Sequence, residues 1–248
     1  MTDFDPKKQP LSYFAQKQQQ INTFVAEANT LLADNPLCYT GHFISGQPLR
    51  PDILFVSINP GHSNRENWED IEARQAQAVV MDFEVVDCKY IADAARGSRY
   101  ANRIVDVICG GDVSRLKHCA ETSFVSYFAA PKEAVLQAQL SELPEPMQQI
   151  HDELTRLAIE QINPKHIICM GWRSFDRFLQ HYGEGNEITV HKLPLMGKME
   201  DYYATTEVNG VTVHGLRHLC TKLSLEMRAR LGEIFTDIWI QIECGNVK

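Results

Sequence analysis

The stretch PDILFVSINPGHSNRENW, residues 51–68, begins as a buried strand and then breaks into polar and turn-forming residues. Its apolar run at 53–56 has strand length and no alternation, which favours a parallel strand covered on both faces. Asn59, Pro60 and Gly61 then turn the chain, because proline fixes φ and glycine accepts a positive φ. Open α/β sheets bind ligands outside the carboxyl ends of their strands. Asn59 is therefore either a turn residue or part of a site.

Further strands and helices alternate on both sides of this stretch. The patterns predict strands at 51–58, 122–131, 166–171 and 211–214, and helices at 11–33, 68–81, 98–109, 147–162, 172–182 and 223–242. Such alternation predicts an α/β fold, a three-layer α/β/α sandwich with a mainly parallel central sheet of about four strands. No repeat or domain boundary is visible. We therefore expect a single domain over 1–248, with 1–50 as a helical extension packed on it.

Composition excludes several classes of protein. The chain has 248 residues and a net charge of −8, which argues against a protein that coats nucleic acid through a basic surface. Its basic runs at 96–118 and 214–230 are either a local binding face or two solvated helix faces. The seven cysteines form no C-x-x-C pair, which fits reduced thiols in the cytoplasm better than disulfides or zinc. We expect no metal, no cofactor, no signal peptide and no membrane contact.

Polar residues follow each expected strand where the strand ends. Taken alone, Asn-Pro-Gly is a common turn, and a lone histidine is more often a satisfied polar group than a catalyst. Their joint placement at strand ends is what indicates a site. The candidates are Asn59, Pro60, Gly61, His62 and Ser63 after the first strand, Ser126 and Tyr127 near the second, Gly171 after the third, and Arg217 to Ser224 after the last.

Three of these segments resemble one family. The sequence ILFVSINPG at 53–61 resembles the first motif of the uracil-DNA glycosylase superfamily, in the form found in mismatch-specific uracil/thymine glycosylases and single-strand-selective uracil glycosylases. RHLCTKLS at 217–224 is similar to the second motif of that superfamily. PKHIICMGWRSF at 164–175 is similar to the strand, glycine and helix that precede that motif. The segments occur in the family's order, and the resemblance covers about 51–240.

The resemblance implies a monofunctional DNA glycosylase, which hydrolyses the N-glycosidic bond of a flipped damaged or modified base, a pyrimidine, and leaves an abasic site. Asn59 would orient the attacking water, His218 would donate a hydrogen bond to the departing base, and Leu223 would wedge into the vacated stack. The implied base pocket contains Ile58, Pro60, Gly61, His62, Trp68, Ser126 and Tyr127. The implied contacts to double- or single-stranded DNA are Ser63, Gly171, Arg173, Thr221, Lys222, Leu223 and Ser224. We expect the enzyme to act as a monomer.

The sequence also departs from the family pattern. The second strand offers Ser126 where uracil-reading members commonly place an asparagine, and the second motif has Cys220, Thr221 and Lys222 in place of its usual proline and small residues. Two alternatives therefore stay open. One is a non-catalytic DNA reader of the same fold, and the other is an enzyme acting on small nucleosides or nucleotides.

Overall fold

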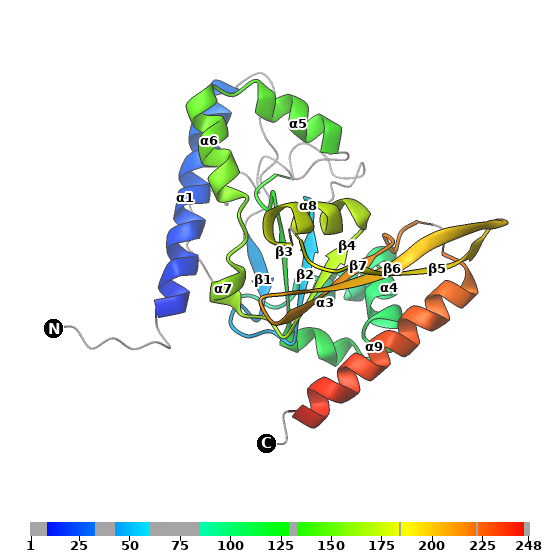
Figure 1. The fold of residues 1–248 in the computed structure, drawn as a ribbon. Coiled ribbons are helices and arrows are strands. Elements are labelled where there is room, and N and C mark those ends of the chain that lie inside the picture. Colours follow the sequence, from blue (N-terminus) through cyan, green and yellow to red (C-terminus); the bar gives the residue numbers. More distant parts are fainter. Residues whose placement is uncertain are drawn as a thin grey trace. The chain divides into compact units, whose positions relative to one another are not determined.

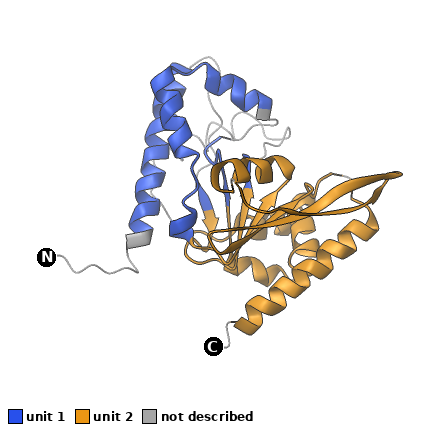
Figure 2. Cartoon of the chain, in the orientation of Figure 1, with its two compact units in different colours: residues 1–44, 57–85, 122–162 blue, residues 45–56, 86–121, 163–248 orange. Residues whose placement is uncertain are grey.

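The computed structural model describes residues 9–32, 43–59, 85–128, 133–183, 185–221 and 223–245. It is a mixed α/β structure with one seven-stranded sheet (Figure 1). The chain divides into two compact units (Figure 2). Unit 1 comprises 1–44, 57–85 and 122–162, and unit 2 comprises 45–56, 86–121 and 163–248. The expected single domain over 1–248 stays a prediction.

The described helices and strands follow the sequence in this order. In unit 1 the helices are α1 (Gln9–Leu31), α5 (Glu133–Ser141), α6 (Glu145–Leu154) and α7 (Ile159–Ile162). In unit 2 the helices are α3 (Lys89–Ala95), α4 (Arg99–Val107), the 3-10 helix η1 (Val113–His118), α8 (Trp172–Tyr182) and α9 (Leu225–Gly245). The strands are β1 (Ile44–Gly46), β2 (Ile53–Ser57), β3 (Cys119–Ser123), β4 (His166–Met170), β5 (Thr189–Leu195), β6 (Lys198–Val208) and β7 (Val211–Leu216).

The sheet is larger and more mixed than the sequence predicted. Its strand order is β1-β3-β2-β4-β7-β6-β5. Strand β4 pairs in parallel with β2 and with β7, whereas β6 pairs antiparallel with both β7 and β5. The expected sheet of about four mainly parallel strands is therefore not confirmed. The sequence did not predict the β5–β6 hairpin, because most of β5 is exposed and its sequence lacks a clear apolar alternation.

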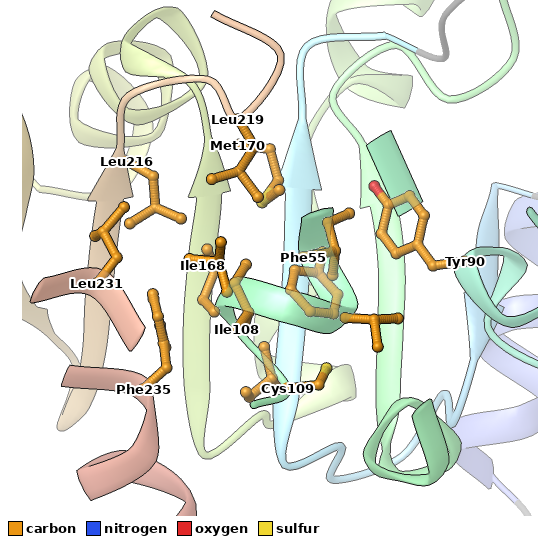
Figure 3. Close-up of a cluster of buried hydrophobic side chains, with 14 of the residues drawn as sticks. Phe55, Tyr90, Ile108, Cys109, Ile168, Met170, Leu216, Leu219, Leu231 and Phe235 are labelled. Carbon is orange, nitrogen blue, oxygen red and sulfur yellow. The ribbon is translucent and has the colours of Figure 1, made fainter. Parts of the chain in front are cut away.

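Helices cover both faces of the sheet in unit 2. Successive side chains of a strand point to opposite faces. Phe55, Ile168 and Leu216 lie in one buried cluster with residues of α3, α4 and α9 (Figure 3). On α8, the Ser174 hydroxyl donates to the Val56 carbonyl at 2.8 Å. A Cβ added to Gly215 would lie 2.6 Å from the ring of Phe175, so glycine permits α8 to approach β7 closely.

Strand β5 is the last strand at one edge of the sheet. Its residues are exposed except near its carboxyl end. The pairing with β6 shifts register between His191 and Lys192, which marks a β-bulge or similar irregularity. Pro194 follows within the same strand, and it has no backbone N–H to offer to a further strand.

Unit 1 has an aromatic core between its helices and the turn after β3. The Tyr127 hydroxyl is 2.7 Å from His151 Nδ1 of α6, and the Tyr127 ring makes an edge contact with Phe24 of α1. Lys17 of α1 donates to the carbonyl of Glu153 on α6 at 3.3 Å. The helix predicted at 11–33 is therefore present as α1, and it packs on α6.

Several predicted elements have different bounds. The buried strand predicted at 122–131, ending in a turn, is present with earlier bounds, because β3 is Cys119–Ser123 and 124–127 already form the turn. The aromatic residues that suggested a strand are buried by ring packing instead. The helix predicted at 147–162 is two helices, α6 and α7. The helix predicted at 68–81 lies outside the described residues. No helix in the described part of the chain is long and apolar enough to cross a lipid bilayer.

Candidate functional site

The best-defined candidate site in unit 2 is the loop after β7, which carries His218. Strand β7 ends at Leu216, and His218 follows two residues later. Its imidazole stacks on the Tyr100 ring of α4, with ring centroids 5.1 Å apart and planes inclined by 2°. A Cβ added to Gly171 would lie 3.5 Å from His218 Cβ and Cδ2. The imidazole is therefore packed against both the aromatic ring and the backbone at the start of α8.

Hydrogen bonds fix the protonation state of His218. The backbone N–H of Cys220 donates to His218 Nδ1 at 3.2 Å, so Nδ1 is an acceptor and carries no proton. The proton of the neutral ring must then be on Nε2. Desolvation by burial lowers the pKa of His218, which favours the neutral ring. His218 is thus a neutral imidazole that can donate a hydrogen bond through Nε2.

The turn that holds His218 closes on itself. The backbone N–H and the hydroxyl of Thr221 donate to the His218 carbonyl at 2.8 and 2.6 Å. From α4, Arg103 donates to the carbonyl of Leu219. Desolvation raises the pKa of Cys220, although the charges of Arg103 and Arg99 act in the opposite direction. The thiol therefore stays protonated at neutral pH and is a poor nucleophile.

The rest of the second motif anchors α9. Leu223 is 6% exposed and belongs to the buried cluster of unit 2. The Ser224 hydroxyl accepts from the backbone N–H of Met227 at 3.1 Å and caps the helix. Leu223 therefore lacks the exposure that a wedge requires. The Thr221 hydroxyl donates within the loop and the Ser224 hydroxyl accepts from α9, and their predicted phosphate contacts stay predictions. The exposed leucine is Leu225, at 83%. Lys222 lies outside the described residues.

Gly171 connects β4 to α8 and has a backbone that only glycine adopts easily. Its φ of 113° and ψ of 152° lie in a region that is essentially restricted to glycine. Its N–H donates to the carbonyl of Cys169 at 3.0 Å within a turn beside His218, and the predicted contact with a phosphate stays a prediction. Arg173 is exposed in the first turn of α8.

The first motif is described as far as Asn59, in unit 1. The backbone N–H of Val125 donates to the carbonyl of Ile58 at 2.9 Å, and Ser57 Oγ is 2.5 Å from Ser123 Oγ. The chain before Asn59 is thus fixed by the end of β3 and the turn that follows it. Ile58 and Asn59 are half-buried. Pro60, Gly61, His62, Ser63 and Trp68 lie outside the described residues.

Two predicted pocket residues follow β3, and both are buried in unit 1. Ser126 is 6% exposed. Tyr127 is fully buried, and its hydroxyl is bonded to His151, so this ring is a core residue and cannot stack on a base as it stands. Sequence patterns placed it near a strand end correctly but gave no sign of its long-range partner.

The structure thus groups the predicted residues by unit. In unit 2 it brings His218, Gly171 and Thr221 together, and in unit 1 it places Ile58 beside the turn that contains Ser126. Sequence reasoning missed Tyr100 and Cys220 as partners of His218, and no spacing rule could have linked them to it. Among the described residues, no group of three or more histidine, cysteine or acidic side chains could hold a metal ion.

Comparisons with known proteins add no family. No family model matches the chain, and no curated protein matches it significantly. A function must therefore be argued from the residues of this chain and the geometry around them.

Proposed function

We propose that this protein is a monofunctional DNA glycosylase of the uracil-DNA glycosylase type. It would hydrolyse the N-glycosidic bond of a flipped modified pyrimidine and leave an abasic site. The observation that carries the proposal is His218, a neutral imidazole with its proton on Nε2, held on a hydrogen-bonded turn just beyond a strand of the sheet.

Strand topology supports the proposal. Strands β2, β4 and β7 are parallel neighbours, so their carboxyl ends lie at one edge of the sheet. Gly171 and His218, both in unit 2, follow the carboxyl ends of β4 and β7 within two residues. Ligands of open α/β sheets bind at that edge. Helices on both faces of the sheet in unit 2 agree with the three-layer α/β/α sandwich that the alternation of strands and helices in the sequence predicts.

The chemistry needs a donor for the leaving base and a positioned water. Breaking the N-glycosidic bond builds negative charge on the departing base, and His218 Nε2–H would stabilise that charge without being cationic. The Asn59 amide does not titrate, so it would orient the water by its carbonyl instead of acting as a base. The target base must first leave the duplex, which costs a few kcal/mol. No step requires a cofactor.

The base is a separate question from the reaction. Ser126 offers a single oxygen that donates and accepts, where an amide would present a donor and an acceptor on two separate atoms. A site that lacks such a pair distinguishes the hydrogen-bonding edge of uracil poorly from that of other bases. We therefore propose larger or exocyclically modified pyrimidines as better substrates than uracil. The exposed Leu225 replaces Leu223 as the side chain that would enter the base stack.

We also propose the cellular compartment and the oligomeric state in which the enzyme acts. The cysteines in the described ranges are free thiols, which supports a reducing cytoplasm. We propose that the enzyme acts on DNA as a monomer.

The test is a panel of oligonucleotides, each with one modified base in single- or double-stranded form, followed by alkali cleavage at abasic sites. We expect the wild-type protein to create an alkali-labile site in at least one substrate. We expect Asn59→Ala to abolish this while DNA affinity stays within a few-fold, because a water-orienting amide acts mainly on the transition state.

The same panel separates the alternatives. Tight binding of a modified oligonucleotide without cleavage would favour the non-catalytic reader, which the changed second motif makes a specific competitor. Neither binding nor cleavage of any oligonucleotide would overturn the proposal and leave the small-molecule enzyme.

A further inference from the structure

An aromatic column runs through unit 2 from the sheet to the His218 loop. It consists of Phe55 on β2, Tyr90 on α3, Tyr100 on α4 and His218. The Phe55 and Tyr90 rings meet edge to face at 5.5 Å, and Tyr90 meets Tyr100 in the same way at 5.9 Å. The column ends in the parallel stack of Tyr100 on His218. Its first two members lie in the buried cluster (Figure 3).

The column fixes the position of the Tyr100 ring. Tyr90 is 2% exposed, and its ring lies edge to face against the Tyr100 ring. The Tyr100 side chain is therefore held by α4 at its backbone and by Tyr90 at its ring. A ring held in this way offers His218 a rigid flat surface.

Helix α4 holds the same loop at a second point. Arg103 lies one helical turn after Tyr100, on the same face of α4, and donates to the carbonyl of Leu219. None of the ion pairs found among the described residues involves Arg103 or Arg99. The Arg103 guanidinium thus donates a hydrogen bond to the backbone carbonyl of the residue next to His218. This contact fixes the chain while Tyr100 fixes the ring.

We propose that Tyr100 is a positioning residue for His218: its ring holds the imidazole against the backbone at Gly171, with Nδ1 on the Cys220 N–H and Nε2 left to donate. This inference rests on the proposed function for the use of Nε2, but the positioning itself can be measured without any substrate. Among the described residues, the titratable and charged groups that act on Tyr100 and Cys220 are Tyr90, Glu121, Arg99 and Arg103.

The decisive comparison is between Tyr100→Phe and Tyr100→Met in the full-length protein. Phenylalanine keeps the stacked ring, and methionine fills a similar space with a flexible chain. Imidazole ¹⁵N NMR gives the tautomer and the pKa of His218, and the signal is assigned by its loss in His218→Gln. We expect wild type and Tyr100→Phe to show one tautomer, with the proton on Nε2. We expect Tyr100→Met to show tautomer exchange and a pKa moved toward the ordinary histidine value.

Activity supplies a second readout where a cleaved oligonucleotide is found. We expect Tyr100→Met to lower the single-turnover rate at least tenfold, with DNA affinity within threefold and recovery in Tyr100→Phe. Tyr182→Leu, which removes a tyrosine from the end of α8, is the matched control and should leave His218 unchanged.

Two outcomes would overturn the positioning role. One is an unchanged His218 tautomer and pKa in folded Tyr100→Met. The other, should that variant not fold, is an unchanged His218 signal in folded Tyr100→Leu, which also removes the stacked ring. Loss of the proposed function would instead appear as absent cleavage by wild type with the NMR differences intact.

Discussion

His214 and His218 are four residues apart, one within β7 and the other past its end, and this difference in position decides what each imidazole can do. His214 lies within β7 and is 3% exposed, with Nδ1 2.8 Å from the Tyr203 hydroxyl and Nε2 3.2 Å from His166 Nδ1. His218 lies past the end of the strand, and only its Nδ1 has a hydrogen-bond partner among the described residues. Both rings have lowered pKa values, yet within the described ranges only the His218 ring keeps a nitrogen without a hydrogen-bond partner.

The comparison separates a structural neutral histidine from an available one. A lowered pKa alone does not identify a site, because burial produces it in both places. The two histidines differ instead in how many ring nitrogens have a hydrogen-bond partner among the described residues. The following predictions use this difference.

The largest effect should come from exchanging the two histidines for glutamine. We expect His218→Gln to lower single-turnover base release by about 10²–10³-fold, the usual loss for one transition-state donor, without moving the melting temperature. We expect His214→Gln to lower the melting temperature, because its partners Tyr203 and His166 lose a buried acceptor or donor. Rapid-quench assays and thermal unfolding of both variants give the result. Equal activity losses in the two would erase the distinction.

The next effect concerns the residue that anchors the His218 loop on its far side. Because Leu223 is buried, Leu223→Ala should lower the free energy of unfolding by about 2–5 kcal/mol. Leu225→Ala is the matched control, since an exposed leucine should change stability by less than about 0.5 kcal/mol. Urea unfolding measures both. A destabilised Leu225→Ala and a neutral Leu223→Ala would reverse the assignment of core and surface.

Acid should destabilise the folded protein through His214, whose two ring nitrogens both have hydrogen-bond partners. Burial, with a contribution from His166, lowers the pKa of His214 to about 3 in the folded protein. The unfolded value is about 6.5, so between these values the unfolded chain binds a proton that the folded chain does not. Stability is therefore complete above about pH 6.5 and should fall by about 1.4 kcal/mol per pH unit below it.

The measurement is urea unfolding between pH 4.5 and 7.5. Burial lowers the pKa of the neighbouring His166, while the charge of Asp52 raises it and that of Lys165 lowers it. The net pKa is lowered, so His166 adds to the same loss of stability in acid. We expect His214→Gln to flatten the slope whatever its absolute stability. A slope unchanged in that variant would assign the acid sensitivity to other groups.

The smallest effect should come from Gly171, where His218 meets the backbone. Gly171→Ala forces a side chain into a backbone region that costs about 1–3 kcal/mol for any other residue. We expect a lower melting temperature, a changed NMR signal of His218 and an unchanged signal of His214. Gly185→Ala, also at positive φ but with nothing within 4 Å of the added Cβ, controls for backbone strain alone.

Sequence patterns were sufficient where a local rule decides the structure. The apolar run of β2, the strand β4 with its following helix, and the Asn209-Gly210 turn before β7 were all predictable, since each depends on neighbouring residues. The order of strands in the sheet and the pairing of the β5–β6 hairpin were not, because they depend on contacts between distant segments. The residues 124–128 misled prediction, because buried aromatic turns and buried strands have the same composition.

The candidate site divides in the same way. His218 was predictable as a polar residue after a strand. Its tautomer was not, because Cys220 supplies a backbone group that no side-chain pattern records. Tyr100 was within a predicted helix, but its stack on His218 joins segments far apart in the chain. Leu223 was predicted to be an exposed wedge, but it is buried. The exact start of α9 decides which leucine faces the core, Leu223 or Leu225, and the sequence pattern does not fix that start.

The irregular edge strand β5 has a consequence for how copies of this protein behave when crowded. Open sheet edges invite strands of neighbouring molecules to add on and seed aggregates. Here the register shift at His191 and Lys192 breaks the regular spacing of backbone donors, and Pro194 removes one donor altogether. The exposed Lys192 adds a charge that an incoming strand would have to desolvate. This edge therefore protects the folded chain from growing into sheets with its own copies.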